Sequence, residues 1–356
     1  MTRPPISGLS SFILFLFALS PLVGGCSSMS YERSEHFDGS KFFNPGAPSP
    51  KSFLDVLKWQ WTSEKKPWPD RVELEPQPPP TSPNSGQAST TYINHATHLV
   101  QISGINFLTD PIFSNRASPF SWLGPKRVHP PAIELNDLPE IHFVVISHNH
   151  YDHMDVDSIR QLSERNNPVF IVPLGNEKLI RAMGAKQVIE LDWWQSHNIE
   201  KSNVLVTLTP AHHWSARGLF DRNEALWGGY VIDSKSLKIF FAGDTGYSKI
   251  FSEIKDRLGP FDLSIIPIGA YEPRWFMKEH HVNPEEAVQI HIDLGSKISI
   301  GTHFGTFQLT DEGRDEPEQH LKEALLKRSL PLSIFKVPKP GESFLVEGSL
   351  LQETKD

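Results

Sequence analysis

The sequence predicts a mixed α/β fold of the α+β class, a four-layer αββα sandwich, on three observations. From residue 90 onward, apolar segments rich in β-branched residues alternate with segments of helical periodicity. Residues of the metal-binding types directly follow several of the strand-like segments. The chain has 356 residues, which is enough for one large layered domain preceded by an extension.

The first residues predict a secretory signal of the lipoprotein type. Arg3 precedes a short apolar run at residues 12–19, and small residues then lead to Cys26. A basic start and an apolar core too short to span a membrane are typical of a signal peptide. Val23-Gly24-Gly25-Cys26 resembles a bacterial lipoprotein box, which implies a signal peptide over residues 1–25 and lipidation of the Cys26 thiol. An ordinary signal peptide with an incidental cysteine is the alternative.

The residue after this cysteine and the net charge indicate where the protein acts. Ser27, rather than aspartate, favours sorting to the outer membrane, so we expect a lipid-anchored protein of the cell envelope, on the periplasmic side. The net charge of −8 argues against broad adhesion to anionic lipid, which leaves the acyl anchor as the membrane tether. No basic stripe with interleaved aromatic residues is present, so nucleic acid is not expected as a partner.

Residues 26–87 are expected to form an N-terminal extension. Tyr31 to Asp70 is mixed in composition, has aromatic clusters at Phe42-Phe43 and Trp59-Gln60-Trp61, and shows no recognisable lipid-binding helix. The proline-rich stretch from Glu75 to Gly86 predicts an extended linker. The extension either covers part of the main domain or spaces that domain from the membrane.

The main domain, expected over residues 88–350, opens with predicted strands. Tyr92 to Gln101 and Ile105 to Leu108 predict a hairpin that ends at Asp110-Pro111. Further apolar, β-branched segments predict strands at residues 141–147, 204–209, 237–242 and 297–300.

Helix signals separate these strands. Met154 to Arg165 predicts a helix with Asp155 as its cap and an apolar face on one side. Asn283-Pro284-Glu285-Glu286 begins another, because it combines a capping side chain, proline in the first turn and acids near the positive end of the dipole. Two more helices are predicted at residues 177–183, ending at Gly184, and at residues 317–327.

The run His148-Asn149-His150-Tyr151-Asp152-His153 follows the strand at residues 141–147 and predicts a metal centre. His148 and His150 can face one ion, because alternate residues leaving a strand point the same way. Asp152 and His153 can turn to a second ion as the chain enters the helix. A structural zinc site would more often contain cysteine pairs, and this chain has none nearby. A histidine-rich polar loop is the alternative.

Three further strand ends carry residues of the same types. The strand at residues 204–209 leads to His212-His213, and the strand at residues 237–242 leads to Asp244. The strand at residues 297–300 leads to His303. Glycines flank Asp244 and His303, as expected where a backbone bends closely around a ligand cluster. Singly, Asp244 could be a turn residue and His303 a core residue, but together the four strand ends favour one site.

Longer blocks of sequence resemble a known family. HxHxDH, a lone histidine, GDT and a late histidine in GTHFGT are similar to the metallo-β-lactamase superfamily. The resemblance narrows to the N-acylphosphatidylethanolamine-hydrolysing phospholipase D family and its bacterial lipoprotein relatives on the blocks SHNHYDHMD, TPAHHW, FFAGDTGY, GAYEPRWFM, HVNPEEAV and GTHFGTF. It covers roughly residues 91–307 and implies the metallo-β-lactamase αββα fold.

The resemblance implies a site for two zinc ions. The implied ligands are His148, His150 and His213 on one ion, Asp152, His153 and His303 on the other, and Asp244 on both. His213 is chosen over His212 because the family histidine lies directly before the tryptophan of TPAHHW. Asp152 and Asp244 are therefore expected to be catalytic through the ions. Imidazole and carboxylate suit zinc, although iron and manganese accept the same ligand types.

Other residues are expected around the ions. His281 matches a family histidine thought to line the site, where it can orient the phosphate or protonate the leaving alcohol, with a capping or supporting role as the alternative. We also expect substrate contacts from Tyr151, Tyr271, Arg274 and His280. Arg274 can fork onto a phosphate oxygen or pair with Glu272 or another acid, and Tyr151 can simply pack. The remaining histidines, His95 among them, are interpreted as surface or satisfied core residues.

The expected activity is hydrolysis of a phosphodiester by a phospholipase D type enzyme. Two close ions lower the pKa of a shared water from about 15.7 towards 7 and neutralise the phosphoryl oxygens. The resemblance implies N-acylphosphatidylethanolamine as substrate, with attack on phosphorus yielding N-acylethanolamine and phosphatidic acid. The ligand pattern alone supports only metal-assisted hydrolysis, so a lactone, β-lactam or sugar phosphate ester is an alternative substrate. A non-catalytic, lipid-anchored zinc- or lipid-binding lipoprotein is a second alternative, which the full ligand set including Asp244 disfavours.

Overall fold

The computed structural model describes residues 31–47, 51–200 and 202–348. The predicted signal peptide and Cys26 lie outside these residues. Among the helices of the described ranges, none has the length and apolar character needed to cross a membrane.

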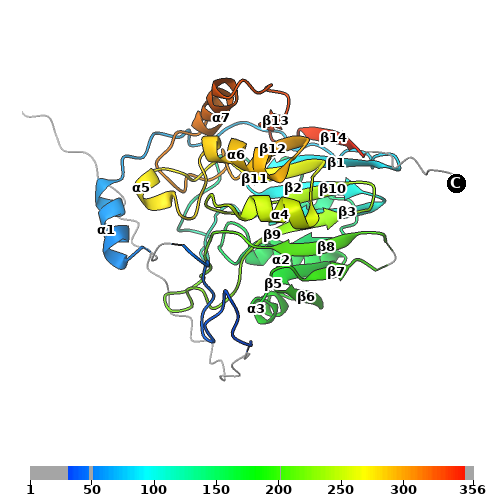
Figure 1. The fold of residues 1–356 in the computed structure, drawn as a ribbon, viewed down its shortest axis with the longest axis horizontal. Helices are drawn as coiled ribbons and strands as arrows, with labels where there is room; N and C mark the ends of the chain where they lie inside the picture. Colours follow the sequence, from blue (N-terminus) through cyan, green and yellow to red (C-terminus); the bar gives the residue numbers. More distant parts are fainter. Residues whose placement is uncertain (1–30, 48–50, 201, 349–356) are drawn as a thin grey trace, which may run out of the picture.

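Two seven-stranded sheets of mixed strand direction form the centre of the fold (Figure 1). The first sheet has, in spatial order, β14 (Ser343–Glu347), β1 (Gln87–Asn94), β2 (Thr97–Ile102), β3 (Ile105–Thr109), β4 (Phe143–Val145), β5 (Val169–Pro173) and β6 (Gln187–Leu191). The second has β13 (Phe335–Lys336), β12 (Ile298–Thr302), β11 (Leu263–Pro267), β10 (Lys238–Phe241), β9 (Gly229–Asp233), β8 (Leu205–Thr209) and β7 (Ser196–Asn198). Each sheet is part antiparallel and part parallel: β3 to β6 are parallel to one another, as are β10 to β13, whereas β3 pairs antiparallel with β2 and β10 pairs antiparallel with β9.

Three apolar layers hold the sheets and helices together. Phe107 and Phe143 of the first sheet lie in one core cluster with Leu208 and Phe241 of the second, so the sheets pack face to face. The outer face of the first sheet packs on α2 (Val156–Arg165) and α3 (Glu177–Ala182). The outer face of the second packs on α4 (Ile250–Leu258), α6 (Pro284–Leu294) and α7 (Glu316–Lys327). The predicted αββα sandwich is confirmed.

The helix ends follow from their capping residues. The Asp155 side chain accepts a hydrogen bond from the backbone of Ser158 and begins α2, as predicted. α6 begins with a reciprocal capping box between Asn283 and Glu286 and ends at Gly295 in the left-handed conformation, with φ of 62°. Each of these two helices begins shortly after a segment of the site described below: α2 follows the turn after β4, and α6 follows the segment with His280 and His281.

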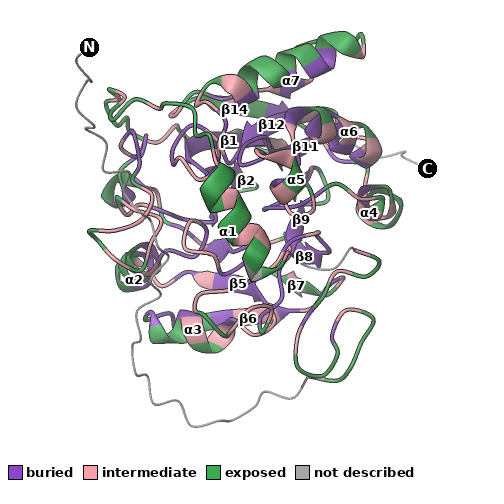
Figure 2. Ribbon diagram, turned by 90° about the vertical axis from the view of Figure 1, so that its left-hand side faces the viewer, coloured by how far each residue is buried: buried purple, intermediate pink, exposed green. Residues whose placement is uncertain are grey.

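The N-terminal extension contains a helix that the sequence interpretation did not predict, α1 (Phe53–Thr62). Figure 2 shows α1 lying across the end of the sandwich beside the short helix α5 (Arg274–Met277). The Trp59 ring stacks on Phe276 with centroids 4.8 Å apart, and the Lys58 ammonium lies 4.6 Å from the Trp275 ring centroid. The proline-rich stretch that follows is extended and lies against the main domain, since Gln77 donates to the Ala132 carbonyl at 2.7 Å.

Candidate metal centre

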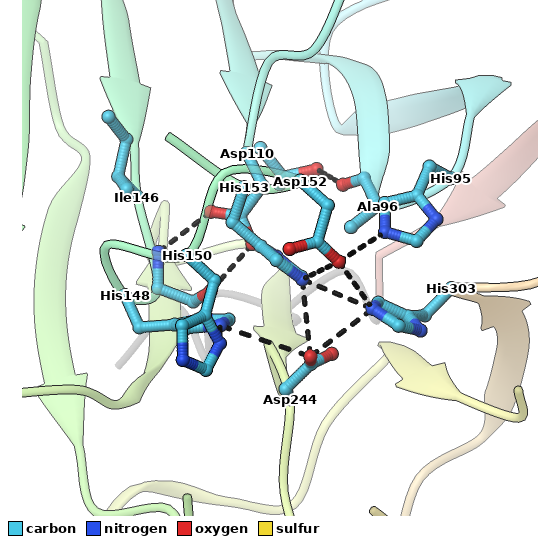
Figure 3. Close-up of polar contacts among 12 residues, drawn as sticks. His95, Ala96, Asp110, Ile146, His148, His150, Asp152, His153, Asp244 and His303 are labelled. Carbon is cyan, nitrogen blue, oxygen red and sulfur yellow. Dashed lines mark hydrogen bonds and ion pairs between the residues drawn. The ribbon is translucent and has the colours of Figure 1, made fainter. Parts of the chain in front are cut away.

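The loops after four strands meet at one end of the sandwich. The turn between β4 and α2 carries His148, His150, Asp152 and His153. The loops after β8, β10 and β12 of the other sheet supply His213, Asp244 and His303. Figure 3 shows the side chains from the β4 turn directed towards Asp244 and His303. The structure therefore brings together all seven residues that the sequence assigned to the ions.

A glycine permits this close approach. Gly243 adopts φ of 60°, and a Cβ atom there would lie only 2.5 Å from the Cβ of Ser147. No side chain fits in that space, so the segment that carries Asp244 can pack directly beside the residue preceding His148. The expectation that glycine here serves a tight bend is confirmed.

The histidines and carboxylates form two adjacent groups. In the first, His150 Nδ1 lies 2.8 Å from His148 Nε2 and 3.2 Å from His213 Nε2. In the second, His153 Nε2 and His303 Nε2 are 3.1 Å apart, and the Asp152 Oδ2 atom is 3.3 Å from each. Each group matches one of the two predicted ligand sets.

Asp244 lies between the groups. Its Oδ2 atom is 3.2 Å from both His153 Nε2 and His303 Nε2. The same oxygen is 3.8 Å from His213 Nε2 and 3.9 Å from His148 Nε2. Its second oxygen is buried and has no hydrogen-bond partner among the described residues. This is the position of a carboxylate that can serve two ions.

The far nitrogens of three rings are held by acceptors. His153 Nδ1 donates to Asp110 Oδ2 at 2.6 Å, and His213 Nδ1 donates to the carbonyl of His280 at 2.9 Å. His148 Nδ1 lies 2.9 Å from the hydroxyl of Ser147, which itself donates to Asp110. A carboxylate and a carbonyl only accept, and the Ser147 hydroxyl already donates to Asp110, so these bonds place a ring hydrogen on Nδ1 and direct Nε2 towards the centre.

Burial and charge set the ionisation of the two groups. Burial lowers the pKa of His148 and His213 well below the usual value and that of His150 to about 3, so these rings are neutral donors. Burial also lowers the pKa of His303, but the Asp244 and Asp152 carboxylates outweigh it and raise the value to about 9. Carboxylates that stabilise a proton on this ring would equally stabilise a metal cation beside it.

The residues fit a site for two metal ions. In the first group, the nitrogens of three neutral imidazole rings converge, which is favourable only around a shared cation or proton. His150 Nε2 and Asp244 Oδ1 are buried without a hydrogen-bond partner in the described part of the chain. The set includes nitrogen and carboxylate ligands and no thiolate, as suits zinc, iron or manganese.

His280 and His281 lie beside the first group at the partly open side of the site. His281 Nδ1 is 3.9 Å from Asp244 Oδ2, and the His281 ring centroid is 5.1 Å from that of His213. Neither ring nitrogen of His280 nor Nδ1 of His281 has a partner within the described residues. Both rings therefore remain candidates for contact with a substrate. The backbone of His212, by contrast, is bound to the loop that carries Asp244: its amide donates to the Thr245 hydroxyl and its carbonyl accepts from the Gly246 amide.

Three predicted substrate contacts are used elsewhere in the fold. Tyr271 is buried, and its hydroxyl is 2.7 Å from His320 Nδ1 of α7, so the structure gives this hydroxyl a partner within the fold. Arg274 forms an ion pair with Glu286 at 2.7 Å and donates to the carbonyl of His281 at 2.8 Å, which is the predicted alternative of a pair with an acid. Tyr151 packs under the guanidinium of Arg217 and donates to its carbonyl at 3.0 Å.

Two residues of the site were missed by the sequence interpretation. Asp110, directly after β3, accepts hydrogen bonds from the Ser147 backbone and hydroxyl and from His153. Its position after a strand was the same signal that identified Asp244. His95, interpreted as a surface or core histidine, is buried with Nε2 3.0 Å from Asp152 Oδ2. It lies in the β1–β2 turn, and no pattern in the sequence connected that turn with the site.

Comparisons with known proteins agree with this geometry. A Beta-lactamase superfamily domain matches residues 105–304. The chain is 44% identical over 245 residues to the N-acyl-phosphatidylethanolamine-hydrolyzing phospholipase D 1 of Caenorhabditis elegans, across 66% of this chain and 69% of that protein. It is 36% identical over 237 residues to the mitochondrial enzyme of the same description in Saccharomyces cerevisiae, across 65% of this chain and 50% of that protein. A metallo hydrolase from the archaeon Ignicoccus hospitalis shares the fold, with a TM-score of 0.55 and 20% identity, across 74% of this chain and 100% of that one.

Proposed function

Because this chain belongs to the Beta-lactamase superfamily, and within it to the family of the N-acylphosphatidylethanolamine-hydrolysing phospholipases D, it is a metal-dependent hydrolase, and we propose that it is a dinuclear zinc phosphodiesterase. Its proposed reaction is hydrolysis of N-acylphosphatidylethanolamine to N-acylethanolamine and phosphatidic acid. The dinuclear centre is supported above all by the place of Asp244, whose Oδ2 atom lies within 4 Å of histidines from both ligand groups.

The proposed roles follow from the two groups. His148, His150 and His213 would hold one ion and Asp152, His153 and His303 the other, with Asp244 common to both. Ions bound there would supply Lewis acidity that lowers the pKa of water and offsets the negative charge of the phosphoryl oxygens. Asp110 and the His280 carbonyl orient His153 and His213 through their Nδ1 atoms.

His281 is proposed to contact the reacting phosphate. Its Nδ1 atom is buried, lacks a hydrogen-bond partner among the described residues and lies 3.9 Å from Asp244 Oδ2, while the side chain as a whole is 14% exposed. A hydrogen bond from this ring can orient a phosphoryl oxygen or place a proton on the leaving alcohol. Arg274 supports that arrangement, since it binds the His281 carbonyl and is itself fixed by Glu286.

A lipid substrate is supported by the outer face of α1. Leu54, Leu57 and Trp61 lie on one side of the helix and are 73%, 47% and 90% exposed. Trp59, on the other side of the helix, stacks on Phe276 of α5, and α5 precedes His280 and His281 by only a few residues. An exposed apolar stripe next to the site is costly in water and favourable at a bilayer interface. We propose that α1 lies on the lipid surface from which the substrate is drawn.

We further propose that Cys26 carries the lipid anchor and that the protein acts in the cell envelope, at the periplasmic side of the outer membrane. The support is the sequence from Val23 to Ser27. Metabolic labelling with an alkyne fatty acid should mark the protein, and Cys26→Ser should abolish the label. Labelling that persists in the variant would contradict the anchor.

The reaction is tested with zinc-loaded protein and N-acylphosphatidylethanolamine in mixed micelles prepared in ¹⁸O-water. Mass spectrometry should detect N-acylethanolamine without ¹⁸O and phosphatidic acid with one ¹⁸O atom, because attack occurs at phosphorus. Asp244→Asn should abolish both products. Turnover of lactones, β-lactams or sugar phosphates without release of N-acylethanolamine would contradict the lipid substrate and leave the metal centre in place.

A further inference from the structure

We propose that His95 is a positioning residue that fixes Asp152, and through it the second metal site, in the geometry needed to bind an ion. His95 Nε2 lies 3.0 Å from Asp152 Oδ2, and the His95 side chain is only 1% exposed (Figure 3). The inference rests on the proposed role of Asp152 and His303 as ligands and does not depend on the substrate.

The backbone of His95 is clamped to the segment that carries His303. Its carbonyl accepts hydrogen bonds from the His303 amide and from the Thr302 hydroxyl, both at 2.8 Å. Its own amide donates to the Thr306 hydroxyl at 2.9 Å. These three bonds join the β1–β2 turn to β12 and the loop after it, so they fix the backbone of His95 relative to that of His303.

The turn also uses an unusual backbone conformation. His95 adopts φ of 46°, in the left-handed region that residues other than glycine rarely enter. Glycine or asparagine would relieve this strain but could not extend a ring to Asp152. A histidine kept in a strained turn is consistent with a requirement for its side chain.

The side chain of His95 can act on only one ligand oxygen. Asp152 Oδ2 is an acceptor, so His95 Nε2 carries the hydrogen and donates it. The same oxygen is 3.3 Å from the Nε2 atoms of His153 and His303. His95 Nδ1 is buried and lacks a partner among the residues described, so the ring makes no other polar contact that would explain its place. The ring also packs with its centroid 4.1 Å from that of His303, so the hydrogen bond to Asp152 is the polar contact through which this side chain would act on a ligand.

The arrangement is the carboxylate counterpart of the bond between His153 and Asp110. A carboxylate whose oxygen accepts a hydrogen bond from a fixed donor is already ordered before the metal binds. The free-energy cost of ordering this ligand therefore does not reduce the affinity for the ion. His95 should therefore matter for the second ion and leave the first, held by His148, His150 and His213, unaffected.

The test compares zinc affinities of the full chain and three variants by competition with a chromophoric chelator, with bound zinc counted by mass spectrometry. His95→Asn suits the left-handed turn but cannot reach Asp152, and it should weaken the second zinc about 10–100-fold without changing the first. His95→Gln places an amide N–H near the original Nε2 position and should restore most of that affinity. His291→Gln is the matched control, because His291 of α6 is also buried but its Nδ1 atom contacts the Ser299 hydroxyl, outside the His95 turn and both ligand groups, and this variant should bind both ions normally.

Urea unfolding of the metal-free proteins establishes that each variant is folded, and His95→Ser replaces His95→Asn with the same expected values should the latter not fold. Cobalt loading supplies a second readout, since the visible absorption of the second ion should change in His95→Asn and return in His95→Gln. Unchanged zinc affinity in His95→Asn would overturn the proposal, as would equal weakening in His95→Gln or His291→Gln. A parent protein that binds one ion would overturn the dinuclear centre and this inference with it, whereas absent lipid hydrolysis with two bound ions would contradict only the proposed substrate.

Discussion

Asp110→Asn is the substitution that most directly tests how the second group of ligands is held. Asp110 is fully buried and accepts three hydrogen bonds. Its Oδ2 atom takes the His153 Nδ1 and Ser147 hydroxyl donors, both at 2.6 Å, and its Oδ1 atom takes the Ser147 amide at 2.7 Å. Asparagine has the same shape but only one acceptor oxygen, so one group must change partner.

Either orientation of the new amide leaves a donor facing a donor. With its oxygen in place of Oδ2, the amino group meets the Ser147 N–H; with its oxygen in place of Oδ1, the amino group meets the His153 N–H. One buried donor without a partner costs about 1–3 kcal/mol of unfolding free energy. Loss of the orienting bond to His153 should also weaken metal binding about 10–100-fold, which corresponds to about 1.4–2.7 kcal/mol.

The assay is urea unfolding of the metal-free protein followed by zinc titration against a chelator. Asp157→Asn is the matched control, because this exposed aspartate of α2 pairs only with Arg160 at the surface and should change stability by less than about 0.5 kcal/mol. An Asp110→Asn protein with parental stability and parental affinity for both ions would refute the reasoning, since the buried carboxylate would then have no measurable part in holding His153.

Four further outcomes are expected. Asp244→Asn should leave fewer than two metal ions per chain by elemental analysis and lower hydrolysis by more than about 100-fold, because loss of a metal ligand should reduce activity more than loss of a residue that only orients a ligand. Two bound ions at full activity would contradict the bridging position. The double substitution of Leu54 and Trp61 by serine should weaken sedimentation with phosphatidylcholine vesicles about tenfold or more while hydrolysis in detergent micelles persists, and undiminished sedimentation would exclude α1 as the lipid contact. Burial lowers the pKa of His129 to about 4, so between pH 6.5 and 4 this histidine is protonated in the unfolded chain but neutral in the folded chain. The free energy of unfolding should therefore fall by up to about 1.4 kcal/mol for each pH unit below 6.5 because of this group. A His129→Gln protein with the parental pH dependence in urea unfolding would contradict this. Asn283→Ala removes the cap of α6 and should cost about 1 kcal/mol in the same measurement, and a cost near zero would show that Glu286 alone suffices.

The segments that carry the seven clustered residues could be found from the sequence because each follows a strand, and the family resemblance then selected the residues within them. β4, β8, β10 and β12 come from two sheets, yet their carboxyl ends meet at one end of the sandwich. A local pattern is enough to identify such residues, since strand propensity and the residue that follows are adjacent in the chain. Asp110 obeys the same rule after β3 and could have been identified in the same way.

Contacts between distant segments were beyond this kind of reasoning. His95 reaches Asp152 because the β1–β2 turn packs on the loop after β12, and neither segment contains a signal for the other. Tyr271 and Arg274 lie in a block typical of the family, but α5 turns them towards α7 and α6. The helix α1 was missed although Ser52 and Asp55 form a capping box, because Leu54, Leu57 and Trp61 face outward and form no core-facing pattern.

The division of the ligands between the two sheets has a consequence for how the protein matures. One sheet contributes the β4 turn and the other contributes Asp244, His213 and His303, so neither half of the fold owns a working centre. Ions bound between the two sheets would stabilise their packing, raising the free energy of unfolding by about 4 kcal/mol when the free ion is at a thousandfold excess over its dissociation constant. A chain whose two sheets have packed in the wrong arrangement would lack the complete ligand set, so it would be inactive until it reaches the correct fold.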